Sequence, residues 1–218
     1  MCFSATASFT AAGLRAATGA ATLAQVEKRP DIPLAAVPLV FAAQQAVEGA
    51  LWLTVPEGRE HGVLLANAFL FLALVLWPLY VPVAHALVER EPLRRLLMLI
   101  LFPAGIGVAA YSAGIMLARP YRAWPVDHSL TYVNNHPYSP TMAVLYLACT
   151  CLPPLIASSR TINLFGVLVT AGLGIAGIAF YESFISVWCF FAALASLVLF
   201  RFFRERRLAP ALPSPDLH

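Results

Sequence analysis

The sequence predicts an all-α protein: a polytopic membrane helical bundle of seven transmembrane helices, with its N-terminus outside the cytoplasm and its C-terminus inside. Of the 218 residues, 60% are hydrophobic and only 11% are charged, whereas a soluble domain carries about 25% charged residues. The charged residues cluster between long apolar runs, and most basic residues fall in alternate connections. Lipid must therefore surround most of the surface.

Seven segments of the sequence have the length and composition of membrane-crossing helices. A helix needs about 20 residues to cross a hydrocarbon core of about 30 Å. In chain order, the predicted spans are Phe3–Val26, Pro33–Thr54, Val63–Leu87, Leu96–Leu117, Pro140–Ser158, Asn163–Phe180 and Tyr181–Phe202. Together they form a transmembrane domain over residues 1–207, and residues 208–218 form a tail that we expect to be disordered.

The first span is the least apolar, because it is rich in Ala, Thr and Ser and holds Arg15 near its middle. A central arginine costs about 2.5 to 3.5 kcal/mol on the insertion scale. We therefore expect Arg15 to face the bundle or to reach the interface. If this segment instead lies on the inner surface, six crossings remain and Cys2 is cytoplasmic.

Glycine and proline are frequent in the later spans. Glycine allows helix backbones to approach closely, which matters where lipid gives no hydrophobic drive for association. Proline is expected to kink its helix and to free a carbonyl that must be satisfied inside the bundle. The residues concerned are Gly105, Gly107, Gly114, Gly166, Gly172, Gly174, Gly177, Pro78, Pro82, Pro103, Pro153 and Pro154.

The distribution of basic residues gives the orientation. Cytoplasmic connections carry an excess of Lys and Arg, and the arrangement above puts ten of these residues inside and three outside. The inner set is Lys28, Arg29, Arg90, Arg94, Arg95, Arg160, Arg201, Arg204, Arg206 and Arg207, and the outer set is Arg59, Arg119 and Arg122. The sequence thus predicts a multi-pass protein of the plasma (inner) membrane.

The longest connection, Ala118–Tyr138, lies outside in this arrangement. It contains several prolines and aromatic residues, including Tyr132, and no obvious secondary structure. A connection of this length is usually functional or disordered. Its composition favours an ordered cap over the outer end of the helices, with Tyr132 as a candidate ligand contact. The last two spans are joined so briefly that we expect a tight hairpin near Tyr181–Ser183.

Glu48 is the strongest candidate for a functional residue. A carboxylate inside a membrane helix is energetically expensive and marks a functional site by default. Gln44, Glu48 and Trp52 recur at four-residue spacing, so they share one helix face, and Gln45 lies beside it. The alternative is that Glu48 pairs with Arg15, or accepts hydrogen bonds from other helices, and only holds them together.

The last span carries a second polar face. Glu182, Ser186, Cys189, Ala193 and Ser196 follow at steps of four and three residues, which places them on one stripe of a helix. A ligand surface and a close-packing face made of small residues both explain this pattern.

The orientation places these residues at similar depth near the outer side. Cys2, Glu48, His128, Glu182 and Cys189 combine carboxylate, imidazole and thiol groups, which are ligands of zinc and other transition metals. Equally, Glu48 and His128 form a candidate general acid–base pair for hydrolysis. The sequence has no established metal-binding or catalytic motif that decides between these chemistries.

Three segments resemble one family: MCFSATASF at the start, PLVFAAQQAVEGALW in the second span and VWCFFAALAS in the last. The sequence is similar in these segments to uncharacterised bacterial membrane proteins that carry a domain of unknown function. The resemblance implies a polytopic membrane protein and draws attention to Cys2, Glu48 and Cys189, but it implies no activity.

These observations favour an outward-facing polar pocket for a metal ion or small ligand, in which Gln44, Gln45, Trp52, Arg15, Tyr132 and Ser186 are ligand contacts. It could serve a metal-dependent or acid–base hydrolase. A transporter, channel or sensor that uses Glu48 and Arg15 for a proton or ion is an alternative, as is a structural subunit of a membrane complex. Whether the protein is an enzyme, and its oligomeric state, stay open.

Two classes of function are excluded. The sole lysine, Lys28, lies at a membrane edge, so a buried retinal Schiff base is excluded. The basic residues lie at membrane edges rather than on one patch, so we expect no nucleic-acid partner.

Overall fold

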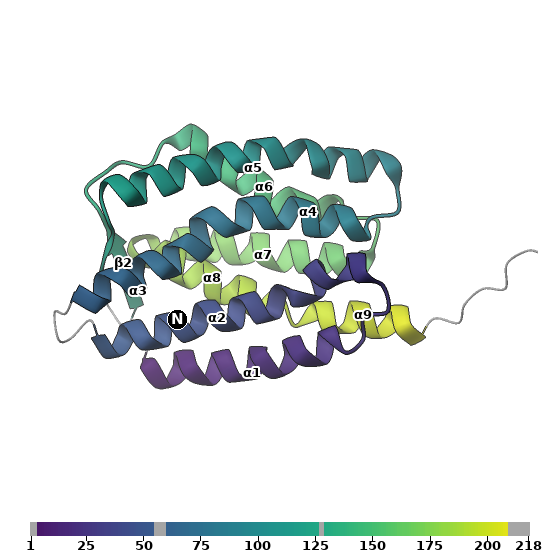
Figure 1. Ribbon diagram of the computed structural model, residues 1–218, viewed down its shortest axis with the longest axis horizontal. Coiled ribbons are helices and arrows are strands. Elements are labelled where there is room, and N and C mark those ends of the chain that lie inside the picture. Colours follow the sequence, from purple (N-terminus) through teal and green to yellow (C-terminus); the bar gives the residue numbers. More distant parts are fainter. Residues whose placement is uncertain (1–3, 55–59, 127–128, 209–218) are drawn as a thin grey trace, which may run out of the picture.

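The computed structural model describes residues 4–54, 60–126 and 129–208, which form a bundle of antiparallel helices with a β-hairpin at one end (Figure 1). The helical elements, in chain order, are α1 (Ala5–Leu23), η1 (Arg29–Asp31), α2 (Ile32–Thr54), α3 (Glu60–Leu70), η3 (Phe71–Leu76), α4 (Trp77–Val88), α5 (Pro92–Ala118), α6 (Pro140–Ile156), α7 (Arg160–Ala179), η4 (Tyr181–Ser183), α8 (Phe184–Ala195) and α9 (Val198–Leu208). The hairpin consists of β1 (Arg122–Val126) and β2 (Ser129–Val133).

Five helical segments in the described ranges are long and apolar enough to cross a membrane, which indicates a membrane protein. They are Arg29–Thr54, Gly62–Val88, Pro92–Ala118, Arg160–Ala179 and Tyr181–Leu208. Helix α6 is apolar but has only 17 residues. Helix α1 has 19 residues but is not among the five, and Arg15 and four threonines lower its mean hydropathy. The predicted helical membrane bundle is therefore confirmed, and the count of seven spans stays a prediction.

Helix α1 packs antiparallel along α2 for most of its length (Figure 1). The Phe9 ring lies against Gly49 near one end of the pair, and Leu39 lies against Gly19 near the other. An added Cβ would come within 2.9 Å of Phe9 at Gly49 and within 2.6 Å of Leu39 at Gly19. The absence of side chains at these glycines therefore allows the two helices to pack closely.

The third predicted span contains a π-helical segment, η3, directly before α4. In a π-helix the carbonyl of residue i pairs with the N–H of residue i+5, so the partner of Ala73 would be Pro78, which has no N–H. The Tyr146 hydroxyl donates to the Ala73 carbonyl instead, at 2.5 Å. A carbonyl freed by proline is thus satisfied inside the bundle, as expected.

Helices α4 and α5 pack closely at a second carbonyl that a proline leaves without its helical partner. Pro82 removes the N–H that would pair with the Pro78 carbonyl in an α-helix. Gly105 of α5 packs directly on this carbonyl, and a Cβ at Gly105 would lie 2.1 Å from the Pro78 oxygen. Position 105 therefore has no room for a side chain, whereas Gly107 has no atom within 4 Å of its Cβ position.

The connection Ala118–Tyr138 differs from the sequence prediction, which gave it no regular secondary structure. Strands β1 and β2 pair antiparallel, with Arg122 opposite Val133. Branched and aromatic residues favour strands, and this signal outweighs the prolines here. The described parts of this connection are bonded to the helices: the Asn67 side chain bonds both the backbone N–H (3.1 Å) and the backbone carbonyl (3.0 Å) of Tyr121, and Ser129 donates to Ser183 at 2.6 Å. Its role as an outer cap stays a prediction.

The predicted tight hairpin between the last two spans is confirmed, because η4 joins α7 to α8 directly. The final span is not one continuous helix, however. Helix α8 ends at Ala195 and α9 begins at Val198. The Ser196 hydroxyl donates to the Ala193 carbonyl at 2.6 Å, and such local bonds compete with helix hydrogen bonding.

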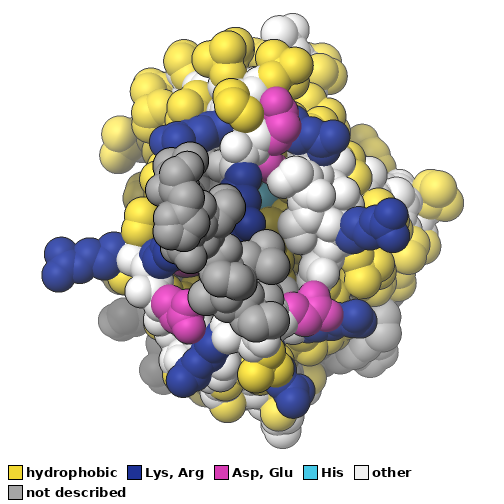
Figure 2. All heavy atoms as spheres, turned by 90° about the vertical axis from the view of Figure 1, so that its right-hand side faces the viewer, with side chains coloured by type: hydrophobic (Ala, Val, Ile, Leu, Met, Phe, Trp, Pro, Cys, Tyr) yellow, Lys and Arg dark blue, Asp and Glu magenta, His cyan; other side chains and the backbone are white. Residues whose placement is uncertain are grey.

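Lys and Arg side chains gather around the end of the bundle opposite the hairpin (Figure 2). At this end lie the α1–α2, α4–α5 and α6–α7 connections together with α9 (Figure 1). All ten basic residues predicted to be cytoplasmic lie in these connections, in the first turn of the helix that follows one of them (Arg94, Arg95 and Arg160), or on α9.

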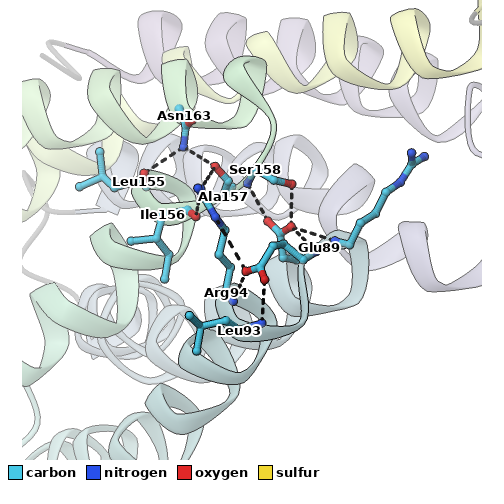
Figure 3. Close-up of polar contacts among 10 residues, drawn as sticks. Glu89, Leu93, Arg94, Leu155, Ile156, Ala157, Ser158 and Asn163 are labelled. Carbon is cyan, nitrogen blue, oxygen red and sulfur yellow. Dashed lines mark hydrogen bonds and ion pairs between the residues drawn. The ribbon is translucent and has the colours of Figure 1, made fainter.

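Glu89 links two of these connections (Figure 3). In the α4–α5 connection it accepts the N–H of Arg90 at 2.8 Å, and across the bundle it accepts the Ser158 N–H at 2.7 Å and hydroxyl at 2.6 Å. Arg94 donates to the carbonyls of Ile156 (2.8 Å) and Ala157 (3.0 Å) in the same neighbourhood. Burial alone would raise the pKa of Glu89, but the hydrogen bonds from Ser158 and the backbone outweigh it and lower the pKa below 4.5.

The stability of the protein should consequently depend on the ionisation of Glu89. A carboxyl whose pKa is lower in the folded chain stabilises it fully above the unfolded pKa, and this contribution is lost as the pH falls through the folded pKa. We expect Glu89→Gln to reduce stability at pH 7 by about 1 to 3 kcal/mol, because hydrogen bonds to a charged acceptor are lost. Unfolding in detergent at pH 7 and at acidic pH measures the effect. The difference from wild type should shrink in acid. The control is Glu27→Gln, which changes an exposed side chain and should leave stability at pH 7 nearly unchanged.

Candidate functional site

Glu48 lies fully buried in the middle of the bundle and accepts hydrogen bonds from two side chains. Its side chain is 0% exposed, as is that of Ser186 on α8. The Ser186 hydroxyl donates to Glu48 Oε1 at 2.5 Å, and Gln45 Nε2 donates to Oε2 at 3.0 Å. Each carboxylate oxygen thus has a donor, and the pair joins α2 to α8 across 138 positions of the sequence.

Gln44 and Trp52, predicted to share a face with Glu48, contact different parts of the bundle. Gln44 is fully buried, and its Oε1 accepts the indole N–H of Trp77 at 3.1 Å. Trp52 is half-buried and packs with Leu51 and Leu130 near the β-hairpin. The polar face of α2 therefore extends from α4, past α8, to the hairpin.

Arg15 faces the bundle, as expected from its cost in lipid. Its side chain is 3% exposed, and the guanidinium carbon lies 5.4 Å from the centre of the Phe190 ring. Phe190 is one helical turn beyond Ser186, so the cation enters the same region between α1, α2 and α8. Its pairing with Glu48 stays a prediction.

A pocket of about 660 Å³ opens beneath the β-hairpin. Segment 132–138 forms its rim, and α6 and α8 form its walls. It is lined by Leu74, Tyr121, Tyr132, Val133, Asn134, Asn135, His136, Pro137, Tyr138, Ala143, Tyr146, Leu147, Phe184, Ile185, Trp188 and Cys189. Cys189 shares a helix face with Ser186, so the Glu48 cluster lies behind this part of the pocket wall.

A second, narrow chamber of about 40 Å³ lies deeper in the bundle. Tyr146, Trp188 and Cys189 line both cavities and separate them. The deeper chamber reaches Ala192 on α8 and Thr150 on α6, one turn further from the hairpin. The two cavities together follow α6 and α8 from the rim towards the middle of the bundle.

Comparison with known proteins assigns the chain to a family. A model of a family of unknown function, DUF6629, matches residues 1–214. The chain belongs to DUF6629. No curated protein and no solved structure matches it. The expected membership of an uncharacterised family is confirmed, and the function of this DUF6629 protein must be argued from its own side chains.

The residues described for this DUF6629 protein do not assemble the predicted metal site. Within ranges 4–54, 60–126 and 129–208, no group of three or more His, Cys, Asp and Glu side chains is placed to hold a metal ion. Glu182 is exposed and lines a neighbouring cavity of about 580 Å³ that shares Tyr132, Phe184 and Ile185 with the pocket. Glu48 is buried, and Cys189 lines the pocket. Cys2 and His128 lie outside the described residues, so their predicted roles stay predictions.

His85 lies at the end of α4 away from the hairpin, where a transport pathway across the bundle would need a polar group, and it makes contacts typical of a packed side chain. It is buried, donates from Nδ1 to the Val81 carbonyl at 2.8 Å, and stacks on Phe165 with ring centres 6.2 Å apart. These contacts give no reason to prefer transport over binding.

Sequence reasoning found Cys189 and Tyr132 but missed the other pocket walls, chiefly Tyr146, Trp188 and Tyr138. These aromatic residues look like ordinary core or interface residues in an apolar helix. What they share is their position: each lies near the hairpin end of its helix or in the connection Ala118–Tyr138. That pattern gains meaning only when α6 and α8 are known to face one cavity.

Proposed function

We propose that this DUF6629 protein crosses the membrane seven times and binds a small molecule in the pocket beneath the β-hairpin, on the outer side of the plasma membrane. The five long apolar segments are completed by α6 and by α1, which runs alongside α2. The concentration of Lys and Arg at the opposite end (Figure 2) supports a cytoplasmic C-terminus. The pocket then opens outward.

The observation that carries the proposal is the pocket itself. Its volume of about 660 Å³ falls within the range of about 300–1,000 Å³ typical of small-molecule sites. Aromatic side chains from three separate regions, among them Tyr138, Tyr146 and Trp188, form its walls. Such sites are mostly apolar, with a few polar groups that fix orientation.

In this proposal the Glu48 cluster positions the pocket wall. The Glu48–Ser186 bond fixes the register of α8 against α2, and Cys189 is presented to the pocket one turn further on. Hydrolysis by Glu48 and His128, with or without a metal ion, draws no comparable support from the described residues.

Binding can be tested with a neutral, environment-sensitive naphthylamine probe and the full-length protein in lipid nanodiscs, with empty nanodiscs subtracted. We expect saturable fluorescence with energy transfer from tryptophan. Ala143→Trp, which places an indole in the pocket, should weaken binding by at least about tenfold, a change of about 1.4 kcal/mol. The matched control is Ala110→Trp on the exposed face of α5. Equal affinity in both variants would reject the pocket as the binding site.

A further inference from the structure

The polarity of the pocket changes from its rim to its floor. Among its lining residues, amide and imidazole side chains occur only at the rim, in Asn134, Asn135 and His136. The walls further in are formed by side chains such as Leu147, Phe184 and Trp188. A ligand that fits this gradient has a polar end and a long apolar body.

The shape of the two cavities favours a chain over a compact ring system. From Phe184 to Ala192 the cavities follow α8 over eight positions, which corresponds to about 12 Å of helix. The deeper chamber holds only about 40 Å³ and is bounded by Phe41, Val169 and other apolar side chains. This volume has no room for a ring, so a ligand that passes Tyr146 and Trp188 into the chamber must end in a single hydrocarbon chain.

The charge at the rim favours an anion. Arg122 pairs with Val133 across the two strands, and directly opposed residues project from the same face of a hairpin. Val133 lines the pocket, so the exposed Arg122 side chain lies beside its opening. The lining residues described for this pocket include no carboxylate. Glu182 lines the neighbouring cavity, on the far side of Tyr132, Phe184 and Ile185, which both cavities share.

We propose that the ligand is a single-chain anionic amphiphile of the fatty-acid type. Its carboxylate binds at the rim beside Arg122 and His136, and its chain follows α6 and α8 to the Tyr146–Trp188 wall. This inference rests on the proposed function and adds the chemical class of the molecule.

The position of Trp188 at the end of the main pocket provides a direct readout. Heavy bromine atoms quench tryptophan fluorescence at contact, so stearic acid brominated in mid-chain should quench Trp188 in nanodiscs. The same quenching should be absent in Trp188→Phe. The methyl ester of the brominated acid, which has the same chain but no charge, should need about tenfold higher concentration because it cannot accept a charge-assisted bond.

Arg122→Gln should remove this difference in affinity between acid and ester without weakening the binding of the ester. Arg160→Gln at the opposite end of the bundle should change the affinity of neither ligand.

If acid and ester bind equally to wild type, the proposed anionic head group is wrong. If brominated phospholipid in the nanodisc quenches Trp188 and free acid adds nothing, the ligand is a bilayer phospholipid, and the single-chain assignment is overturned. If the naphthylamine probe binds but no brominated chain quenches Trp188, the assignment of an amphiphilic ligand is wrong, while the proposed small-molecule binding stands. If neither the probe nor a brominated chain binds, both the ligand assignment and the proposed function are wrong.

Discussion

Replacing Gly105 by alanine is expected to destabilise the bundle by about 3 kcal/mol or more, which is the upper end of the cost of overpacking. The new Cβ would lie 2.1 Å from the Pro78 carbonyl oxygen. This atom belongs to a helix backbone and cannot rotate away, so α4 and α5 would have to separate. Thermal unfolding of the purified protein in detergent measures the loss.

Gly107→Ala is the matched control, since it makes the same change on the same helix where nothing lies within 4 Å. Alanine favours a helix over glycine by about 1 kcal/mol, so this variant should be as stable as wild type or slightly more so. Equal melting temperatures for the two variants would show that α5 does not pack on Pro78 in this way.

The second large effect is expected at Glu48. Glu48→Leu should cost about 2 to 4 kcal/mol, because it leaves the hydroxyl of Ser186 and the amide of Gln45 buried without their acceptor, and a buried unsatisfied group costs about 1–3 kcal/mol. Glu48→Gln should cost less, since the Gln45 amide can turn and present its oxygen. Binding of the naphthylamine probe should weaken along with stability, because α8 carries the pocket wall.

Two serine variants separate this role from general packing. Ser186→Ala removes a donor to Glu48 and should cost about 1–3 kcal/mol. Ser196→Ala removes a buried hydroxyl bonded only locally, to the Ala193 carbonyl, and should be nearly neutral. A Glu48→Leu variant as stable as wild type, or equal effects of the two serine variants, would contradict the bond between α2 and α8.

Hydropathy predicts the long spans well, since a helix in lipid must satisfy its own backbone and remain apolar over a fixed length. Gly62–Val88 and Pro92–Ala118 match their predicted spans to within a few residues. The hairpin and the break at Ser196 are local hydrogen-bonding features that an average over a window of residues does not detect. Helix α1 is difficult for the opposite reason: its packing on α2 is clear in the structure, while its hydropathy is low.

In the candidate site, too, some features follow from the sequence and others only from how the helices pack. The cost of a carboxylate in a membrane helix identified Glu48, and helical spacing identified Ser186 on a polar stripe of the last span. Their partnership depends on how α2 and α8 pack together, and spacing within one helix carries no information about that. The same limit applies to Glu182, which shares a stripe with Ser186 but lies at the exposed end of the bundle, where it cannot join Glu48.

The link made by Glu89 also has a consequence for biosynthesis. Ser158, its partner across the bundle, follows it by 69 residues, so at about 5–20 residues per second the ribosome makes it roughly 3 to 14 seconds later. During that interval only the neighbouring N–H groups of Arg90 and Glu91, of its partners in the folded protein, have been made. The link can close only after α5 and α6 have been synthesised and the chain has turned towards α7. It therefore distinguishes a nascent chain that has passed this point from one that stalled earlier.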